Sequence, residues 1–305
     1  EINLDKKKLL INGQGKIKFN NDFEDIKFKV LKIKNKFNFN TELDLDNTPF
    51  KINFLNFVKN DKSKTRIRFA GSYEPENSLD FEDISIINEN NRLIFKNIFL
   101  NKNNLIEKVD EVKLEFLDNQ NKKNNILLKK IKQNKYQITG SSFNAEKLID
   151  SLLVGKKDNN LKLFQNDIEI SLNLKEIYLD NLYLVNDLNG NLDIKNNEIY
   201  TANISGDFDN VNNLKFTVNT NDVGEKITTL FSSKAKPLVE RYKFIKGFED
   251  NEEGYLDFYS SKKNGISNSK LIIDNFKVKE IPVLAKLLAL ASLQGIADLL
   301  TGEGI

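Results

Sequence analysis

Residues 26–45 read IKFKVLKIKNKFNFNTELDL, and apolar residues recur at every second position over most of this stretch. Ile26, Phe28 and Val30 occupy even positions, whereas Phe37 and Phe39 occupy odd ones. Successive side chains of a β-strand point to opposite faces, so this alternation predicts strands with one apolar face. A bulge or turn must absorb the change of phase, because a slip of one residue would send the apolar side chains to the other face.

Similar alternation recurs along most of the chain. Clusters of Asn, Asp and Gly separate the apolar runs and are typical of turns, and the alternate positions carry Lys, Asn, Glu and Asp, which are predicted to face water. We therefore expect a mainly β fold with a few helices, built as an elongated, twisted antiparallel meander. Further strands are predicted near residues 50–57, 66–71, 93–100, 112–116, 126–131, 136–139, 168–174, 182–184, 192–194, 204–208 and 214–218.

Three segments depart from the alternation and favour helix. Asn144 is suited to cap a helix near residues 144–153, which carries its apolar residues on one side. A second helix is predicted near residues 223–241, bent or divided at Pro237.

The third predicted helix spans residues 281–300, within IPVLAKLLALASLQGIADLLTGEGI at residues 281–305. Its polar residues cluster on one side, which indicates an amphipathic helix that covers an apolar sheet face rather than a membrane span. These residues are Lys286, Gln294, Asp298 and Thr301. The chain has no Met and begins with Glu1, so we expect it to be a segment of a longer protein with both natural ends missing.

The amino-acid composition argues against most kinds of catalytic and metal-binding site. The chain has neither Cys nor His, which removes thiolate nucleophiles, histidine bases and Cys/His zinc sites. Its 46 basic and 44 acidic residues balance to +2, and no basic face indicates nucleic-acid binding. Gly13-Gln14-Gly15 is interpreted as a hairpin turn, and Asp44, Asp46 and Asn47 as the wet face of a strand rather than a calcium loop. We expect no enzymatic activity, catalytic residue, metal site or cofactor.

The last part of the chain carries a family resemblance. Residues 219–247 (NTNDVGEKITTLFSSKAKPLVERYKFIKG) precede residues 254–276 (GYLDFYSSKKNGISNSKLIIDNF) and the closing segment at 281–305. This succession resembles the C-terminal region of AsmA-like proteins of the YhdP type, in the AsmA/TamB superfamily. The resemblance is specific over about residues 140–305. It implies two parts: residues 1–140, a repeated-strand segment of a longer sheet, and residues 141–305, the AsmA-like C-terminal region.

The resemblance implies a periplasmic protein of a Gram-negative bacterium, anchored in the inner membrane by a helix upstream of this chain. Such proteins form a U-shaped sheet with an apolar groove for phospholipid acyl chains, transfer phospholipid between the inner and outer membranes, and can have an outer-membrane partner. The alternative is an assembly factor of outer-membrane biogenesis with a packed core and no lipid, because both uses demand the same alternation. Candidate groove residues are Phe28, Phe37, Phe39, Phe69, Leu172, Leu184, Phe216, Phe258, Leu287 and Leu288.

Overall fold

The chain is predominantly β. The computed structural model describes residues 2–5, 8–19, 21–60, 62–153, 166–196, 198–211, 213–242, 246–248, 254–274 and 278–280. These residues form 22 strands, two α-helices and one 3-10 helix. The chain divides into two compact units between Asn134 and Lys135. The boundary predicted between residues 140 and 141 instead falls inside a strand, β13 (Lys135–Asn144).

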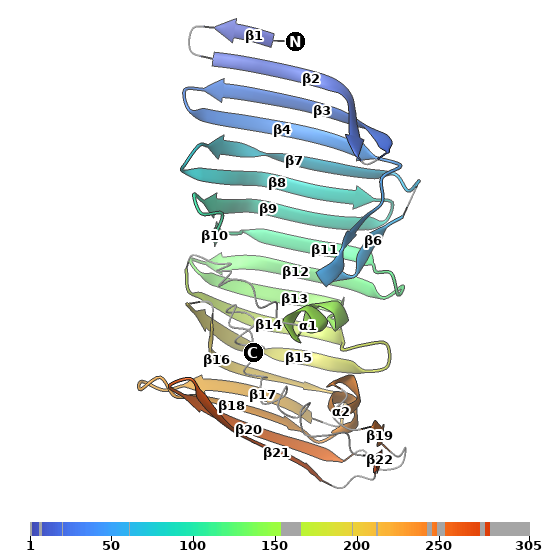
Figure 1. The fold of residues 1–305 in the computed structure, drawn as a ribbon, viewed down its shortest axis with the longest axis vertical. Helices are drawn as coiled ribbons and strands as arrows, with labels where there is room; N and C mark the ends of the chain where they lie inside the picture. The colour runs from blue at the N-terminus through green and yellow to red at the C-terminus, as the bar shows by residue number, and fades with distance from the viewer. Residues whose placement is uncertain are drawn as a thin grey trace. The chain divides into compact units, whose positions relative to one another are not determined.

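The N-terminal unit contains a long antiparallel sheet whose strands lie side by side (Figure 1). Its hydrogen-bonded ladder follows the chain order β1–β2–β3–β4–β7–β8–β9–β11–β12, with β10 also beside β9. The strand bounds are β1 Ile2–Asp5, β2 Lys8–Phe19, β3 Asp22–Ile33, β4 Lys36–Leu45, β7 Thr65–Glu74, β8 Ser78–Asn88, β9 Asn91–Asn101, β10 Ile106–Lys108, β11 Glu111–Leu117 and β12 Lys123–Lys132.

A tight turn absorbs the change of phase seen in residues 26–45. Ile33 pairs with Lys36, so only Lys34 and Asn35 connect β3 to β4. Lys34 takes a left-handed conformation with φ of 54°. Across this turn, Val30 on an even position lies opposite Phe39 on an odd position. Both therefore lie on the same face of the sheet, because directly paired residues share a face.

Residues 50–59 form a short flap instead of the single strand predicted at 50–57. β5 (Phe50–Ile52) pairs with β6 (Phe57–Lys59), and a 3-10 turn at Asn53–Leu55 joins them. Asn56 ends that turn in a left-handed conformation with φ of 55°, which asparagine tolerates better than most residues. We call residues 50–59 the flap; β6 runs across the strands of the N-terminal sheet near their ends (Figure 1).

The interpretation of Gly13-Gln14-Gly15 as a hairpin turn is wrong, because all three residues lie inside β2. Gly13 pairs directly with Phe28 on β3. A Cβ atom at Gly13 would lie 2.3 Å from Cζ of the Phe28 ring. The glycine therefore serves to make room for an aromatic ring that lies across the neighbouring strand.

The C-terminal unit has a mixed sheet, so the prediction of a purely antiparallel meander is wrong here. β13 pairs in parallel with β14 (Ile168–Tyr178), and helix α1 (Glu146–Leu153) lies between them in the chain. A parallel pair needs such a crossover, and alternation alone does not report strand direction. Antiparallel pairs then link β14 to β15 (Leu184–Lys195), β16 (Glu198–Asp207), β17 (Asn213–Thr220), β18 (Lys226–Ser232), β20 (Tyr255–Lys263) and β21 (Ile266–Asp274).

The helix predictions have three different outcomes. The first is confirmed: the backbone N–H of Glu146 donates to Asn144 Oδ1 at 3.1 Å, which caps α1. The second is wrong, because residues 223–241 contain β18 and only a short helix, α2 (Lys236–Tyr242), with Pro237 in its first turn. The buried residues of β18 alternate with partly exposed ones, so the strand period prevails there. The helix predicted at 281–300 lies outside the described residues.

A small ladder completes the described C-terminal unit, with β19 (Lys246–Phe248) antiparallel to β22 (Val278–Glu280). No helix in the described part of the chain combines the length and the apolar character needed to cross a bilayer.

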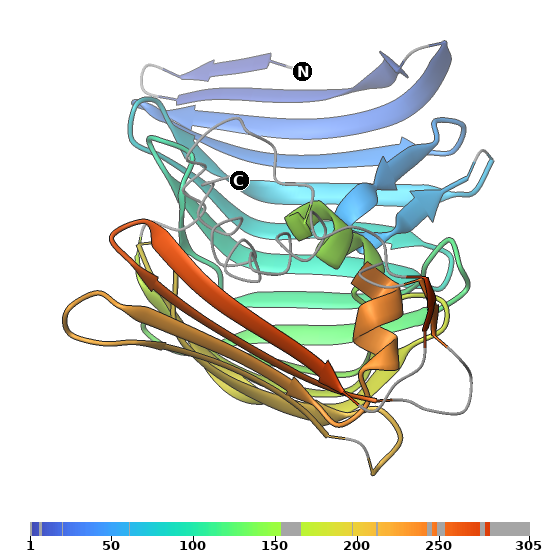
Figure 2. The same cartoon turned by 60° about the horizontal axis from the view of Figure 1, so that its bottom comes forward.

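Arg241 on α2 joins three segments at one end of the C-terminal strands, where α1 and α2 lie close together (Figure 2). Its guanidinium donates to the carbonyl oxygen of Leu179 at 2.9 Å and to that of Glu146 at 3.2 Å. It also pairs with Asp150 Oδ1 at 2.5 Å. Burial would raise the pKa of Asp150, but the hydrogen bond and charge of Arg241, helped by Lys147, outweigh it and lower that pKa.

Removing this junction is expected to loosen the C-terminal unit. Arg241→Ala leaves two carbonyl groups without their hydrogen-bond donor and a partly buried carboxylate without its cation. We therefore expect a loss of about 1–3 kcal/mol in the free energy of unfolding. Urea unfolding followed by circular dichroism measures it. Arg68→Ala is the matched control, because Arg68 is exposed on the sheet of the other unit. Equal, small losses for both variants would show that the junction is not structural.

Candidate functional site

One face of the N-terminal sheet is almost entirely apolar. Directly paired residues share a face, so the strand registers define rows that run across the sheet. The central row is Gly13, Phe28, Thr41, Phe69, Ile84, Phe95, Val112 and Leu128. Its neighbour is Gly15, Ile26, Leu43, Ile67, Ile86, Leu93, Leu114 and Ile126. On the other side lie Ile11, Val30, Phe39, Gly71, Phe81 and Ile98.

We call these rows the apolar face. Aromatic rings pack along it: the Phe39 ring lies 6.2 Å from that of Phe69 and 5.8 Å from that of Phe81, both edge-on. Yet most side chains of the central row remain partly exposed, among them Phe28 and Phe69. The same holds for Phe39 and Phe81 in the adjacent row. Extended apolar surface of this kind is uncommon on soluble monomers and marks interaction sites.

The opposite face of the same sheet is polar. The rows between the apolar ones pair Lys27 with Glu42 and Glu42 with Arg68, and pair Asp25 with Asp44 and Asp44 with Arg66. Arg66 forms an ion pair with Asp44 at 2.8 Å, and the Arg66 side chain is more than half exposed. The opposite face is thus mainly polar, although apolar residues such as Phe23, Ile87 and Ile94 also lie on it.

The flap closes one end of the apolar face. Phe57 is fully buried, and its ring meets that of Phe116 on β11 edge-on with centroids 5.5 Å apart. Phe50 lies against Phe57 with ring centroids 5.9 Å apart. Leu45 and Leu93 are also buried. Burial thus falls from this end of the strands towards the middle of the face.

Asp46 and Asn47, which were predicted on the wet face of a strand, instead follow the end of β4 at Leu45 in the turn that leads into the flap, and two buried charges anchor this turn. Glu24 is only 2% exposed, and its carboxylate accepts the backbone N–H groups of Asp46 (2.8 Å), Asn47 (2.9 Å) and Thr48 (2.5 Å). Burial would raise the pKa of Glu24, but hydrogen bonds from the turn outweigh it and lower that pKa. The Lys59 ammonium, on a side chain with 0% exposure, donates to the carbonyl oxygen of Asp46 at 3.3 Å.

The other end of the apolar face carries a cation. A fourth row, next to the one through Phe39 and counted here as the last row of the apolar face, is Leu9, Lys32, Phe37, Tyr73, Leu79 and Leu100. The Lys32 Nζ atom lies 5.1 Å from the centre of the Phe37 ring, within cation–π range. Tyr73 is 45% exposed and lies 6.3 Å from Phe37 between ring centroids. This end of the face is therefore wetter than the flap end.

The C-terminal unit has a corresponding apolar row, but part of it is buried. Ile138, Leu172, Gly190, Ile204, Phe216, Leu230, Phe258 and Leu271 are successive cross-strand partners. Phe258 is 1% exposed and Leu230 is 6% exposed, whereas Leu172 and Phe216 are partly exposed. At these strands the row is closer to a packed core than to an open surface.

The candidate residues from the sequence divide accordingly. Phe28, Phe37, Phe39 and Phe69 come together on the apolar face of the N-terminal unit, and Leu172, Phe216 and Phe258 share one row of the C-terminal unit. Leu184 does not join that row: β15 has an irregularity between Asn186 and Asn189, beyond which Val185 is the inward, buried residue, so its neighbour Leu184 points to the other side of the strand. Leu287 and Leu288 lie outside the described residues.

Sequence reasoning missed Lys32, Glu24 and the flap. Lys32 has the same parity as Phe28 and Val30, so its position on the apolar face follows from the alternation once the strand is placed. Glu24 has that parity too, but nothing in the sequence shows that its partners lie more than 20 residues ahead, as the hydrogen bond between Glu24 and Asp46 requires.

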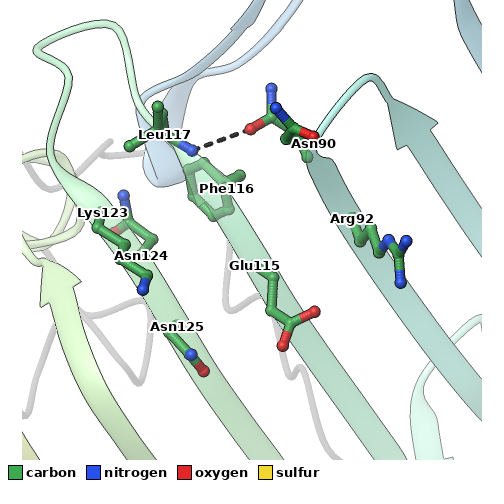
Figure 3. Close-up of a pocket in the computed structure, with 9 residues that line it drawn as sticks. Asn90, Arg92, Glu115, Phe116, Leu117, Lys123, Asn124 and Asn125 are labelled. Carbon is green, nitrogen blue, oxygen red and sulfur yellow. Dashed lines mark hydrogen bonds between the residues drawn. The ribbon is translucent and has the colours of Figure 1, made fainter.

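A polar hollow of about 470 Å³ lies at the ends of β9, β11 and β12 (Figure 3). The side chain of Asn91 accepts the backbone N–H of Leu117 there at 3.0 Å. Its lining contains one carboxylate, Glu115, which is paired with Lys113 at 3.0 Å. The facing pair of carboxyl groups that glycosidases use is not present in this lining. Within the described residues no cluster of acidic side chains is arranged to hold a metal ion.

Comparison with known proteins adds no relative: no family model, no curated protein and no solved structure matches this chain.

Proposed function

We propose that this chain is a lipid-binding segment of a larger, bridge-like protein that transfers phospholipid between the inner and outer membranes of a Gram-negative bacterium. In this proposal the sheet curls into a U-shaped groove whose lining is the apolar face. The full-length protein is periplasmic and held to the inner membrane by an upstream helix, with a possible partner in the outer membrane. The proposal rests on the AsmA-like resemblance and on one observation, the partly exposed apolar face of the N-terminal unit.

The physical argument concerns what such a face can hold. Its rows present Phe, Ile, Leu and Val side chains from consecutive strands. On β3, the side chains that face this side from Ile26 to Val30 are Ile26, Phe28 and Val30, and none of them is charged. Each methylene group of an acyl chain that leaves water contributes about 0.8 kcal/mol, so contact over several groups retains a lipid without any specific bond. No catalytic residue is required for transfer by this route.

A matched pair of phenylalanines tests the proposal. Phe39 lies on the apolar face, whereas Phe23 is 57% exposed on the opposite face of β3, where Lys18 lies 5.8 Å from its ring. Native mass spectrometry of the purified chain is expected to show co-purified phospholipid. Phe39→Asp is expected to weaken lipid binding about tenfold or more, because a carboxylate cannot be desolvated against an acyl chain. Phe23→Asp is expected to bind lipid like the wild type.

The alternative function, an assembly factor with a packed core and no lipid cargo, is favoured by the burial of Phe258 and Leu230 in the C-terminal unit. The same experiment separates the two proposals. A lipid-free wild-type protein, or loss of the fold in Phe39→Asp, supports the packed core. Equal lipid binding by both aspartate variants means that lipid does not occupy the apolar face.

A further inference from the structure

The two ends of the apolar face differ chemically. At the flap end, Glu24 and Lys59 are both buried and both engaged by backbone groups of the Asp46 turn. At the other end, Lys32 is partly exposed among Leu9, Phe37 and Tyr73. Lys32 is the charged side chain in the rows defined above across β2 to β9. No described residue forms an ion pair with it.

We propose, on the basis of the lipid-binding function above, that each bound lipid lies along the strands, with its phosphate at Lys32 and its acyl chains towards the flap. Charge complementarity selects the headgroup end. A lysine within an apolar row keeps its methylene stem on that row and its ammonium in water, where it can meet an anionic phosphate oxygen. Tyr73 is suited to the same boundary, because tyrosine combines an apolar ring with a polar tip.

The length of the face fits this orientation. Lys32 lies six residue steps along β3 from Ile26, which corresponds to about 20 Å at the rise of an extended strand. One leaflet of a bilayer has a hydrocarbon depth of about 15 Å, half of the full apolar core. An acyl chain that starts near Lys32 therefore ends before the row that contains Glu24, where the buried flap residues begin.

Neither of the two buried charges described at the flap end is suited to bind a phosphate. The Glu24 carboxylate would repel it, and the Lys59 side chain is fully buried with its ammonium on the carbonyl oxygens of Asp46 and Asn60. Phe57 fills the space above Phe116 at this end. Reversal of the lipid would consequently place an anion beside a carboxylate and buried aromatic rings, which costs free energy.

Two soluble probes of equal chain length test the assignment: a short-chain phosphatidylglycerol and the diacylglycerol that lacks its phosphate. Wild-type protein is expected to bind the phosphatidylglycerol about two- to fivefold more tightly at low salt, the range of a solvent-exposed ion pair. Lys32→Glu is expected to remove or reverse this preference and Lys32→Gln to remove it. Lys29→Glu, a change on the polar face of the same strand, is expected to preserve it.

Three outcomes distinguish this inference from the function on which it rests. If neither probe binds the wild type, the lipid-binding proposal itself is wrong. If both probes bind, but with equal affinity in the wild type and in Lys32→Glu, lipid binding stands and the headgroup position is wrong. If inorganic phosphate at the concentration of the lipid displaces the phosphatidylglycerol, Lys32 belongs to a site for free phosphate, which overturns the proposed position.

Discussion

Glu24→Ala is expected to destabilise the N-terminal unit by about 2–4 kcal/mol, because it leaves three turn N–H groups without the carboxylate that accepts them. The change also removes the charge that fixes the start of the flap. Without the flap in place, Phe57 would lose its contact with Phe116. Urea unfolding followed by circular dichroism measures the loss. Asp25→Ala is the matched control, since Asp25 is an exposed neighbour on the same strand.

The same carboxylate predicts a pH dependence. Folding lowers the pKa of Glu24 below its ordinary value of 4.5, so the folded state favours the ionised form. The resulting stabilisation is fully present above that ordinary value and is lost as the pH falls through the lower, folded-state pKa. The difference in unfolding free energy between wild type and Glu24→Gln is therefore expected to be largest at neutral pH and to shrink below about pH 4.5. A difference that is the same at pH 7 and pH 3 would contradict this role for the charge.

The alternation in the sequence predicts which residues share a face, and this succeeds where the strands are regular. Phe28, Phe37, Phe39 and Phe69 come from three strands, β3, β4 and β7, and each shares the parity of other apolar residues in its own strand, but only the strand registers show that they lie on one face. Parity cannot report how far along the face a residue lies from an end. It therefore gives neither the wet end at Lys32 nor the buried end at the flap.

The failures have physical causes. A Gly-x-Gly run favours a turn locally, but at Gly13 the ring of Phe28 on the next strand requires the missing side chain, a contact that local sequence does not reveal. Residues 227–231 place apolar side chains at spacings that suit a helix, whereas pairing with both β17 and β20 makes this segment a central strand. Tertiary pairing overrides local preference most readily in such central positions.

Phe258→Ala is expected to show the largest loss of stability among the candidate groove residues, about 3–5 kcal/mol. Removing a buried phenylalanine ring loses the free energy of its transfer from water and also leaves a cavity. Phe258 is 1% exposed and pairs directly with Leu230, which is also buried. Phe39→Ala is expected to cost less, about 1–2 kcal/mol, since its side chain is already partly exposed and the neighbouring rings of Phe69 and Phe81 can shift towards it.

Chemical unfolding of the two variants, each in the full chain, measures this contrast, and lipid binding supplies the second readout. If the C-terminal row is a packed core, Phe258→Ala lowers stability and alters lipid affinity only where the unit unfolds. Phe39→Ala should instead weaken lipid binding under conditions in which the fold is intact. Equal stability losses at the two positions would mean that the apolar face of the N-terminal unit is packed as tightly as the C-terminal row. Acyl chains would then have no open surface to occupy.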